Sequence, residues 1–285
     1  MSEEARHALG ASPPFREMEV GGVRLTYNDD GEGMTLVCLH AIGHGASDYR
    51  SVREGLSEKY RVIALDWPGH GNSDPDGVPA SPWRYAELLE IFLDQLGIEH
   101  AVLLGNSIGG GVAIRYAAAH MQRVRGLVLC NPQGLDRAGW LAPILCRSMA
   151  RFFGAGARGA KWFDRAFEFY YKMVLAAPAA NAQRARIIAA RREMAPILAQ
   201  AWSSFAQAQA DARALAPQIR VPVQLCWAMR DRFIPLSRNR AAALRFPIAR
   251  LEKFEDSGHS PFIEEPPHFL HVLQRFLDGL RQNRL

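Results

Sequence analysis

Short apolar runs that recur at helix-length intervals constrain the fold of this 285-residue chain more than any other feature. Each run is rich in apolar residues without polar alternation, which is typical of a strand buried on both faces of a sheet. Helical patterns separate the runs, and this alternation predicts a mostly parallel, doubly wound α/β sheet with helices on both sides. The predicted strands are Thr35–Leu39, Arg61–Leu65, Ala101–Leu104, Gly126–Cys130, Val221–Trp227 and Ala249–Phe254.

The segment before the first of these runs has a different pattern. Met18–Tyr27 alternates apolar and polar residues around Gly21-Gly22, which predicts a β-hairpin. Residues 1–17 lack the short apolar core of a signal peptide and are expected to form a loose polar tail.

One long interval interrupts the strand–helix rhythm. Residues 134–217 show helical, alanine- and arginine-rich patterns with no convincing strand. Ligands in open α/β sheets bind outside the carboxyl ends of the strands, and an insertion that leaves directly after a strand covers that site. We therefore expect a helical cap over residues 134–217, inserted into an α/β core of residues 18–133 and 218–285.

A Gly-x-Ser-x-Gly motif, Gly105 to Gly109, falls between a predicted strand and a predicted helix. In that context the serine occupies a sharp, strained turn, and the glycines avoid collisions where the chain doubles back. The Ser107 hydroxyl is then held above the end of the sheet, and the N-terminus of the following helix points at developing negative charge. Ser107 is therefore predicted to be a nucleophile.

A serine nucleophile needs a general base and an acid that orients the base. Of the nine histidines, His259 lies on the loop that follows the last predicted strand and precedes the C-terminal helix. Asp231 follows the preceding strand, and Asp256 lies three residues before the histidine. We predict that His259 is the base and Asp231 the acid. Asp256 is the alternative acid, with a role in fixing the loop as its expected function.

Backbone N–H groups that stabilise an oxyanion are expected at two places. One is Ile108, directly after the serine, and the other is Ile42, in the loop after the first predicted strand of the core. The Gly- and Pro-rich segment Asp66–Asp74 follows the next strand and is expected to be structural, with Trp67 as part of a pocket wall.

From about Val20 to its C-terminus the chain resembles the α/β-hydrolase superfamily. The resemblance rests on five motifs in the order that the family has them: His40–Gly43, Asp66–Ser73, the elbow at Ser107, Asp231 with Pro235, and Gly258-His259 with Glu265-Pro266. It implies attack by the serine, proton transfer through the histidine, an acyl-enzyme and hydrolysis by water, without a metal or organic cofactor. Ala41 stands where the family usually has glycine, and we expect it to narrow the oxyanion loop or to alter the geometry of the oxyanion hole.

The residues around the elbow leave the substrate open. Asn106 and the glycines after Ile108 resemble carbon–carbon bond hydrolases of aromatic ring degradation, which bind a substrate carboxylate through a cap arginine; Arg186 or Arg192 is suited to that role. Those enzymes commonly have tryptophan where this chain has Ser260, and the same asparagine occurs in esterases and lactonases. We expect a hydrolase of a small carboxylic ester or related acyl compound. The alternatives are a carbon–carbon bond hydrolase of a carboxylate-bearing dienoate and, in a different class, a hydrolase-fold ligand-binding module.

Composition and charge narrow the partners. A hydrophobic content of 48% supports a large core, and no apolar stretch reaches the roughly 20 residues of a membrane span. Residues 134–217 hold 12 Lys and Arg against 5 Asp and Glu, which is typical of a solvated helical face rather than of a nucleic-acid module. Four cysteines without a Cys-x-x-Cys pair are expected to be free. We expect a cytoplasmic protein that acts on a small molecule, binds neither nucleic acid nor membranes, and holds no metal; homodimers are common in the family.

Overall fold

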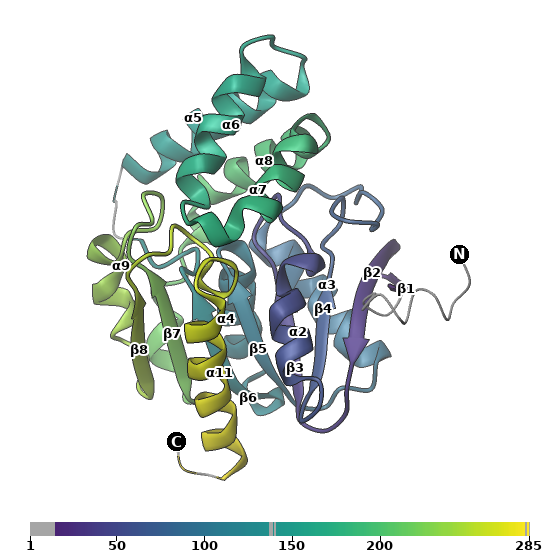
Figure 1. Ribbon diagram of the computed structural model, residues 1–285, viewed down its shortest axis with the longest axis vertical. Helices are drawn as coiled ribbons and strands as arrows, with labels where there is room; N and C mark the ends of the chain where they lie inside the picture. The colour runs from purple at the N-terminus through teal and green to yellow at the C-terminus, as the bar shows by residue number, and fades with distance from the viewer. Residues whose placement is uncertain (1–14, 137–138, 140, 283, 285) are drawn as a thin grey trace.

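The fold is built on an eight-stranded sheet in the part of the chain that the structure describes (Figure 1). This structure, a computed structural model, describes residues 15–136, 139, 141–282 and 284. The strands lie in the order β1-β2-β4-β3-β5-β6-β7-β8. Their bounds are Arg16–Val20 (β1), Val23–Asp30 (β2), Thr35–Leu39 (β3), Arg61–Leu65 (β4), Ala101–Asn106 (β5), Val124–Cys130 (β6), Val223–Ala228 (β7) and Ala249–Phe254 (β8).

Most of the sheet is parallel, as predicted. Six strands, β4, β3, β5, β6, β7 and β8, run parallel to one another, whereas β2 pairs antiparallel with both β1 and β4 at the edge. Every residue of β3, β5 and β7 is buried, because helices cover both faces of the sheet. The opposite edge, β8, is more polar than a buried strand: Arg250 and Lys253 are exposed and Glu252 is half-buried.

The predicted hairpin is present at the N-terminal edge. Val20 pairs with Val23, and the turn between them consists of Gly21 and Gly22, whose φ angles of 56° and 82° favour glycine. Strand β1 begins at Arg16, so the last two residues of the expected tail belong to the sheet. Residues 1–14 of that tail lie outside the described residues.

Helices pack on the two faces of the sheet, in front of it and behind it in Figure 1. On one face α11 contacts α2, and on the other α3 contacts α4, which also contacts β3, β5 and β6. The apolar stripe of α11 has helical spacing, with Phe269, Leu273, Phe276 and Leu277 buried. No helix among the described residues is long and apolar enough to cross a membrane. The bounds are Arg50–Leu56 (α2), Pro82–Gln95 (α3), Ile108–Ala119 (α4), Leu236–Ala243 (α9), Pro261–Glu264 (α10) and Pro266–Arg281 (α11).

Between β6 and β7 the chain forms a helical segment, residues 134–217, which we call the cap. Its α-helices are Leu141–Ala157 (α5), Phe163–Val174 (α6), Asn181–Ala189 (α7) and Arg191–Phe205 (α8), and its described residues contain no strand. Helix α5 packs along α8, and α6 contacts both. A buried aromatic cluster of Phe153, Phe163, Phe167 and Tyr171 fills the space between these helices. Figure 1 shows the cap above the sheet, on the side where β6 ends.

Candidate active site

Ser107 occupies a strained turn between β5 and α4. Its φ of 54° makes it one of two non-glycine residues with positive φ in the described chain, a conformation that costs about 1–3 kcal/mol. Side chains at the two flanking glycines would prevent this turn, because a Cβ on Gly105 would collide with the carbonyl oxygen of Gly109, and one on Gly109 with that of Leu39. The Ser107 N–H donates to the carbonyl of Cys130 (3.1 Å). The surrounding backbone therefore holds the serine in the sharp turn that the motif predicts.

His259 and Asp231 meet beyond the ends of the neighbouring strands β8 and β7. The Nδ1 atom of His259 lies 2.7 Å from Oδ2 of Asp231, and both side chains are buried. The other carboxylate oxygen of Asp231 accepts the N–H groups of Phe233 (2.8 Å) and Ile234 (2.9 Å). A carboxylate held in this way fixes the ring of His259 and leaves Nε2 as the nitrogen available to the cavity.

The pKa of His259 reflects two opposing effects. Burial lowers it, but the charge of Asp231 and the hydrogen bond between the two side chains raise it, and the net result is a pKa above the ordinary value for histidine. The carboxylate thus favours the imidazolium form, which a histidine must adopt when it takes a proton from a nucleophile.

Asn131, which the sequence analysis missed, anchors the acid. Its Nδ2 donates to Oδ2 of Asp231 (2.7 Å), and its Oδ1 accepts the N–H of Ala228 at the end of β7 (2.8 Å). Asn131 is the second non-glycine residue with positive φ, 40°, directly after β6. Asparagine tolerates this conformation better than most residues. An asparagine immediately after the strand beside β7 was the signal that could have identified it.

Glu264, also missed, holds the His259 loop. Its Oε2 accepts three consecutive N–H groups, those of Gly258 (2.9 Å), His259 (2.8 Å) and Ser260 (3.0 Å). Its Oε1 accepts the N–H of Ala177 in the cap (3.0 Å). A single buried carboxylate therefore fixes the loop that carries the histidine and connects that loop to the cap.

The N–H groups of Ile42 and Ile108 are the two that the sequence predicts to stabilise an oxyanion. Ile42 lines the cavity, and no acceptor for its N–H is found within the described part of the chain. Ile108 is the first residue of α4, where backbone N–H groups have no partner within the helix. Ala41, the departure from the family pattern, is buried, and its carbonyl accepts the N–H of His44 (3.1 Å).

Two neutral histidines support the loop after β3, the predicted oxyanion loop. Burial lowers the pKa of both His40 and His70 to about 3, so their rings are neutral and can accept hydrogen bonds at neutral pH. The Nε2 of His70 accepts the N–H of Gly43 (2.9 Å), and that of His40 accepts the N–H of Trp67 (2.9 Å). These bonds fix the loop after β3 against the Asp66–Asp74 segment.

Two residues expected at the substrate lie behind the cavity wall. Asn106 is fully buried; its Nδ2 donates to the carbonyls of Cys130 (3.0 Å) and His259 (3.1 Å), and its Oδ1 accepts the Ser260 hydroxyl (2.9 Å). Trp67 is also fully buried and stacks on Tyr85. Neither lines the cavity. Asn106 supports the His259 loop, and Trp67 packs in the core.

Three charged residues singled out from the sequence lie away from the cavity wall as well. Arg186 pairs with the buried carboxylate of Asp48. Arg192 pairs with Asp164 (3.0 Å) on the cap surface, and exposed Asp256 pairs with Arg230. Each of these charges is matched by a partner outside the cavity lining.

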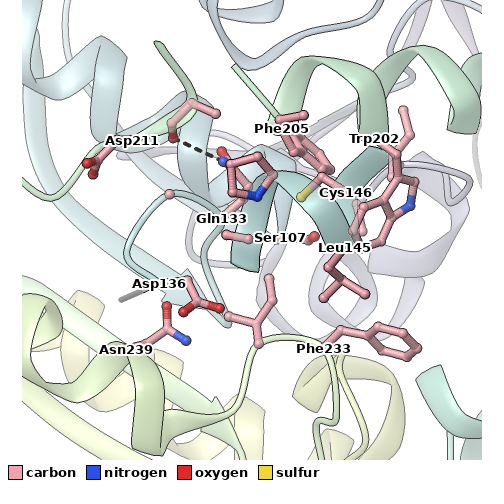
Figure 2. A pocket seen from close by; sticks show the side chains of 18 of the residues that line it. Ser107, Gln133, Asp136, Leu145, Cys146, Trp202, Phe205, Asp211, Phe233 and Asn239 are labelled. Atoms are coloured by element: carbon pink, nitrogen blue, oxygen red, sulfur yellow. Dashed lines mark hydrogen bonds between the residues drawn. The ribbon is translucent and has the colours of Figure 1, made fainter. Parts of the chain in front are cut away.

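The cavity has a volume of about 490 Å³ and lies between the core and the cap. Ser107 and His259 both open into it, as do Ile42 and His44 of the oxyanion loop. Figure 2 shows Ser107 among apolar side chains of the cap and of the segment after β7. That apolar wall includes Leu145, Cys146, Val174, Trp202, Phe205 and Phe233. No cluster of side chains able to hold a metal is found among the described residues.

The α/β-hydrolase class is defined by a mostly parallel sheet, a serine on a strand–helix elbow and a histidine–aspartate pair beyond later strands. The family model described as the alpha/beta hydrolase fold matches residues 35–266, and the chain belongs to this family. It is therefore an enzyme of the hydrolase class.

Similar proteins are found both by sequence and by structure. The chain is 30% identical to 2-hydroxymuconate semialdehyde hydrolase from Pseudomonas putida over 92% of this chain and 93% of the relative. It is 29% identical to a 2-hydroxy-6-oxononadienedioate/2-hydroxy-6-oxononatrienedioate hydrolase from Paraburkholderia phymatum over 97% and 99%. A thermophilic esterase from Thermogutta terrifontis has a similar structure, with a TM-score of 0.78 at 22% identity over 94% of this chain and 99% of that one.

Proposed function

We propose that the chain is a serine hydrolase that cleaves a small carboxylic ester or a related acyl compound. The observation that carries this proposal is the placement of Ser107 and His259 on one cavity, with His259 held by Asp231 at 2.7 Å. In this proposal Ser107 is the nucleophile, His259 the general base and Asp231 the residue that orients the base. The N–H groups of Ile42 and Ile108 form the oxyanion hole.

The reaction would proceed in two halves. The serine oxygen attacks the carbonyl carbon while His259 takes the hydroxyl proton, and the two N–H groups stabilise the negative oxygen of the tetrahedral intermediate. His259 then gives its proton to the leaving oxygen, and an acyl-enzyme remains on Ser107. Water, deprotonated by the same histidine, releases the acid and restores the serine. The raised pKa of His259 supports its role as proton acceptor.

The cavity supports a substrate of moderate size. A volume of about 490 Å³ lies within the range of roughly 300–1,000 Å³ that is usual for small-molecule sites. Its wall is mostly apolar toward the cap, with Leu145, Trp202 and Phe205 among the contributors. We infer that one part of the substrate is apolar and packs beneath the cap.

Hydrolysis of p-nitrophenyl esters, measured beside labelling by a fluorophosphonate probe, tests this proposal. The wild type should hydrolyse short and medium acyl esters and take up the probe. Ser107→Ala should lose both, and Asp231→Asn should lower kcat by several orders of magnitude, about 10⁴-fold in other triads. A wild type that shows neither activity nor labelling would contradict the proposal and favour a ligand-binding module built on the hydrolase fold.

A carbon–carbon bond hydrolase is the second candidate. It is supported by two relatives that match nearly the whole chain, whose names specify 2-hydroxymuconate semialdehyde and 2-hydroxy-6-oxononadienedioate or 2-hydroxy-6-oxononatrienedioate as substrates. Two residues that suggested this activity, Asn106 and Arg186, have other partners in the structure, so we rank the ester reaction first. Loss of the yellow absorbance of a ring-cleavage dienoate, at a rate above that for any ester, would reverse the ranking.

A further inference from the structure

A second imidazole faces the cavity beside the oxyanion loop. His44 lines the cavity together with Ser107 and Ile42, and only 3% of its surface is exposed to solvent. The proposed reaction uses His259 for every proton transfer, so no step requires a second histidine. A buried polar side chain that opens into a mostly apolar cavity needs a partner there or a reason to be present.

The orientation of His44 is fixed by a buried acid. Its Nδ1 lies 2.6 Å from Oδ2 of Asp48, whose side chain is inaccessible to solvent. Burial acts to raise the pKa of Asp48, but the charges of His44 and Arg186 outweigh burial and hold this pKa below its ordinary value. The ionised carboxylate therefore accepts the Nδ1–H, and Nε2 is the ring nitrogen that remains for a ligand.

The cap completes this arrangement. Arg186, on α7, pairs with the second oxygen of Asp48, so one carboxylate joins a core imidazole to a cap guanidinium. Because the guanidinium balances the carboxylate, the pair adds no net negative charge beside the cavity. An anionic ligand that contacts His44 therefore meets no uncompensated negative charge from Asp48.

Tyr171 adds a hydrogen-bond donor at the same place. Its ring centroid lies 6.0 Å from that of His44, and a Cβ on Gly43 would stand 2.5 Å from its hydroxyl oxygen, so the phenol lies directly on the oxyanion loop. Burial raises the pKa of Tyr171 well above the ordinary value, and the hydroxyl therefore keeps its proton. Both His44 and Tyr171 line the cavity that contains Ser107.

We propose that His44 binds a carboxylate of the substrate through Nε2–H, with the Tyr171 hydroxyl as a second donor. This inference rests on the proposed hydrolase function and names its substrate class: acyl compounds that carry a carboxylate on the part lying against the oxyanion loop. His44 and Tyr171 are substrate-binding residues. Asp48 and Arg186 are positioning residues, since they act through His44.

Matched ester pairs test the proposal. The mono-p-nitrophenyl esters of succinate, glutarate and adipate are compared with p-nitrophenyl butyrate, valerate and hexanoate, with non-enzymatic hydrolysis subtracted. For the best carboxylate ester, His44→Gln should raise KM about tenfold relative to the neutral partner, the loss expected for one charged hydrogen bond. KM for the neutral ester should change by no more than about twofold, and Ser107 should still be labelled by the fluorophosphonate probe.

Three further variants separate positioning from general damage. Asp48→Asn should shift the KM ratio in the same direction, and it also serves as the test if His44→Gln does not fold. Arg186→Ala should shift the ratio less, and adding it to His44→Gln should cause no further loss, because both act through one contact. Arg192→Ala removes a cap arginine that pairs with half-buried Asp164 and is the matched control; it should leave the ratio unchanged.

The outcomes distinguish this inference from the proposed function. An equal KM change for both ester series, or none, overturns the carboxylate role of His44 while the hydrolase function stands. Loss of fluorophosphonate labelling in folded His44→Gln also overturns it, because His44 would then act at the reacting atoms. If the wild type hydrolyses no ester, calorimetric binding of monomethyl adipate to Ser107→Ala, with and without His44→Gln, still tests the site: about tenfold weaker binding supports it, and equal binding refutes it.

Discussion

Replacing Glu264 with glutamine should destabilise the protein out of proportion to the size of the change. The carboxylate accepts three loop N–H groups through one oxygen and the N–H of Ala177 through the other. Glutamine retains only one acceptor oxygen, so its NH₂ group must face donors on one side. Hydrogen bonds to charged groups contribute about 1.5–3 kcal/mol and neutral ones about 0.5–1.5 kcal/mol.

The expected magnitude follows from those contacts. Three weakened bonds, at about 1 kcal/mol each, give a loss of about 3 kcal/mol in the free energy of unfolding. For a chain of this size such a loss lowers Tm by roughly 5–10 °C. Because three of the four bonds hold the loop of His259, kcat should fall as well, while KM for a neutral ester changes little.

Thermal and denaturant unfolding of Glu264→Gln, measured beside ester kinetics, checks both effects. Glu255→Gln is the matched control, since Glu255 is an exposed residue that precedes the same loop. Equal stability of the two variants would refute the assignment of Glu264 as the anchor of the loop. A destabilised variant with unchanged kcat would show that the His259 loop keeps its position without the carboxylate.

Three other substitutions test the backbone strain at Ser107, the neutral state of buried His70 and the hydrogen bond that anchors Asp231. Ser107→Gly should be more stable than Ser107→Ala by about 1–2 kcal/mol in denaturant unfolding, because glycine adopts the φ of 54° without strain. Equal stability of the two variants would mean that the turn at residue 107 is not strained. His70 has a folded-state pKa of about 3 against 6.5 for the free side chain, so the unfolded state binds the extra proton and stability falls as pH drops from about 6.5 toward 3. His70→Gln should reduce the slope of unfolding free energy against pH by about 1.4 kcal/mol per unit between pH 4 and 6, and an unchanged slope would rule out a neutral buried ring. Asn131→Gly keeps the positive φ but removes the hydrogen bond to Asp231, and it should lower kcat/KM about tenfold; an effect below twofold would show that the acid needs no such anchor.

The sequence was sufficient for features that depend on local chain geometry. The strands alternate with helices at regular intervals along the sequence. The elbow at Ser107 can be recognised from adjacent residues, because its glycines prevent collisions within the same turn. The strand limits were predicted to within two residues at most ends, with β5 and β6 extended slightly. Strand β8 is more polar than a strand buried on both faces, because an edge strand meets solvent on one side.

Features that depend on distant partners could not be read in the same way. Arg186 was expected to face the substrate, but its partner Asp48 lies 138 residues earlier in the chain, and helical periodicity carries no information about such a pair. Asn106 sits beside the nucleophile in sequence, yet its amide points to the His259 loop, 153 residues later. Neighbouring residues on a strand point to opposite faces, so proximity to Ser107 in sequence did not imply access to the cavity.

The charged character of the two sheet edges bears on how copies of this chain can assemble. Strand β1 presents Arg16, Glu17 and Glu19 to solvent, and β8 at the far edge presents Arg250 and Lys253. Pairing two sheets edge to edge would bring these charges against the backbone of another strand and remove their hydration. Natural proteins use charged residues on edge strands in this way to prevent sheets from growing between molecules. These charges disfavour growth of the sheet through its edges, and we predict that a symmetric dimer of this enzyme would form through helical surfaces.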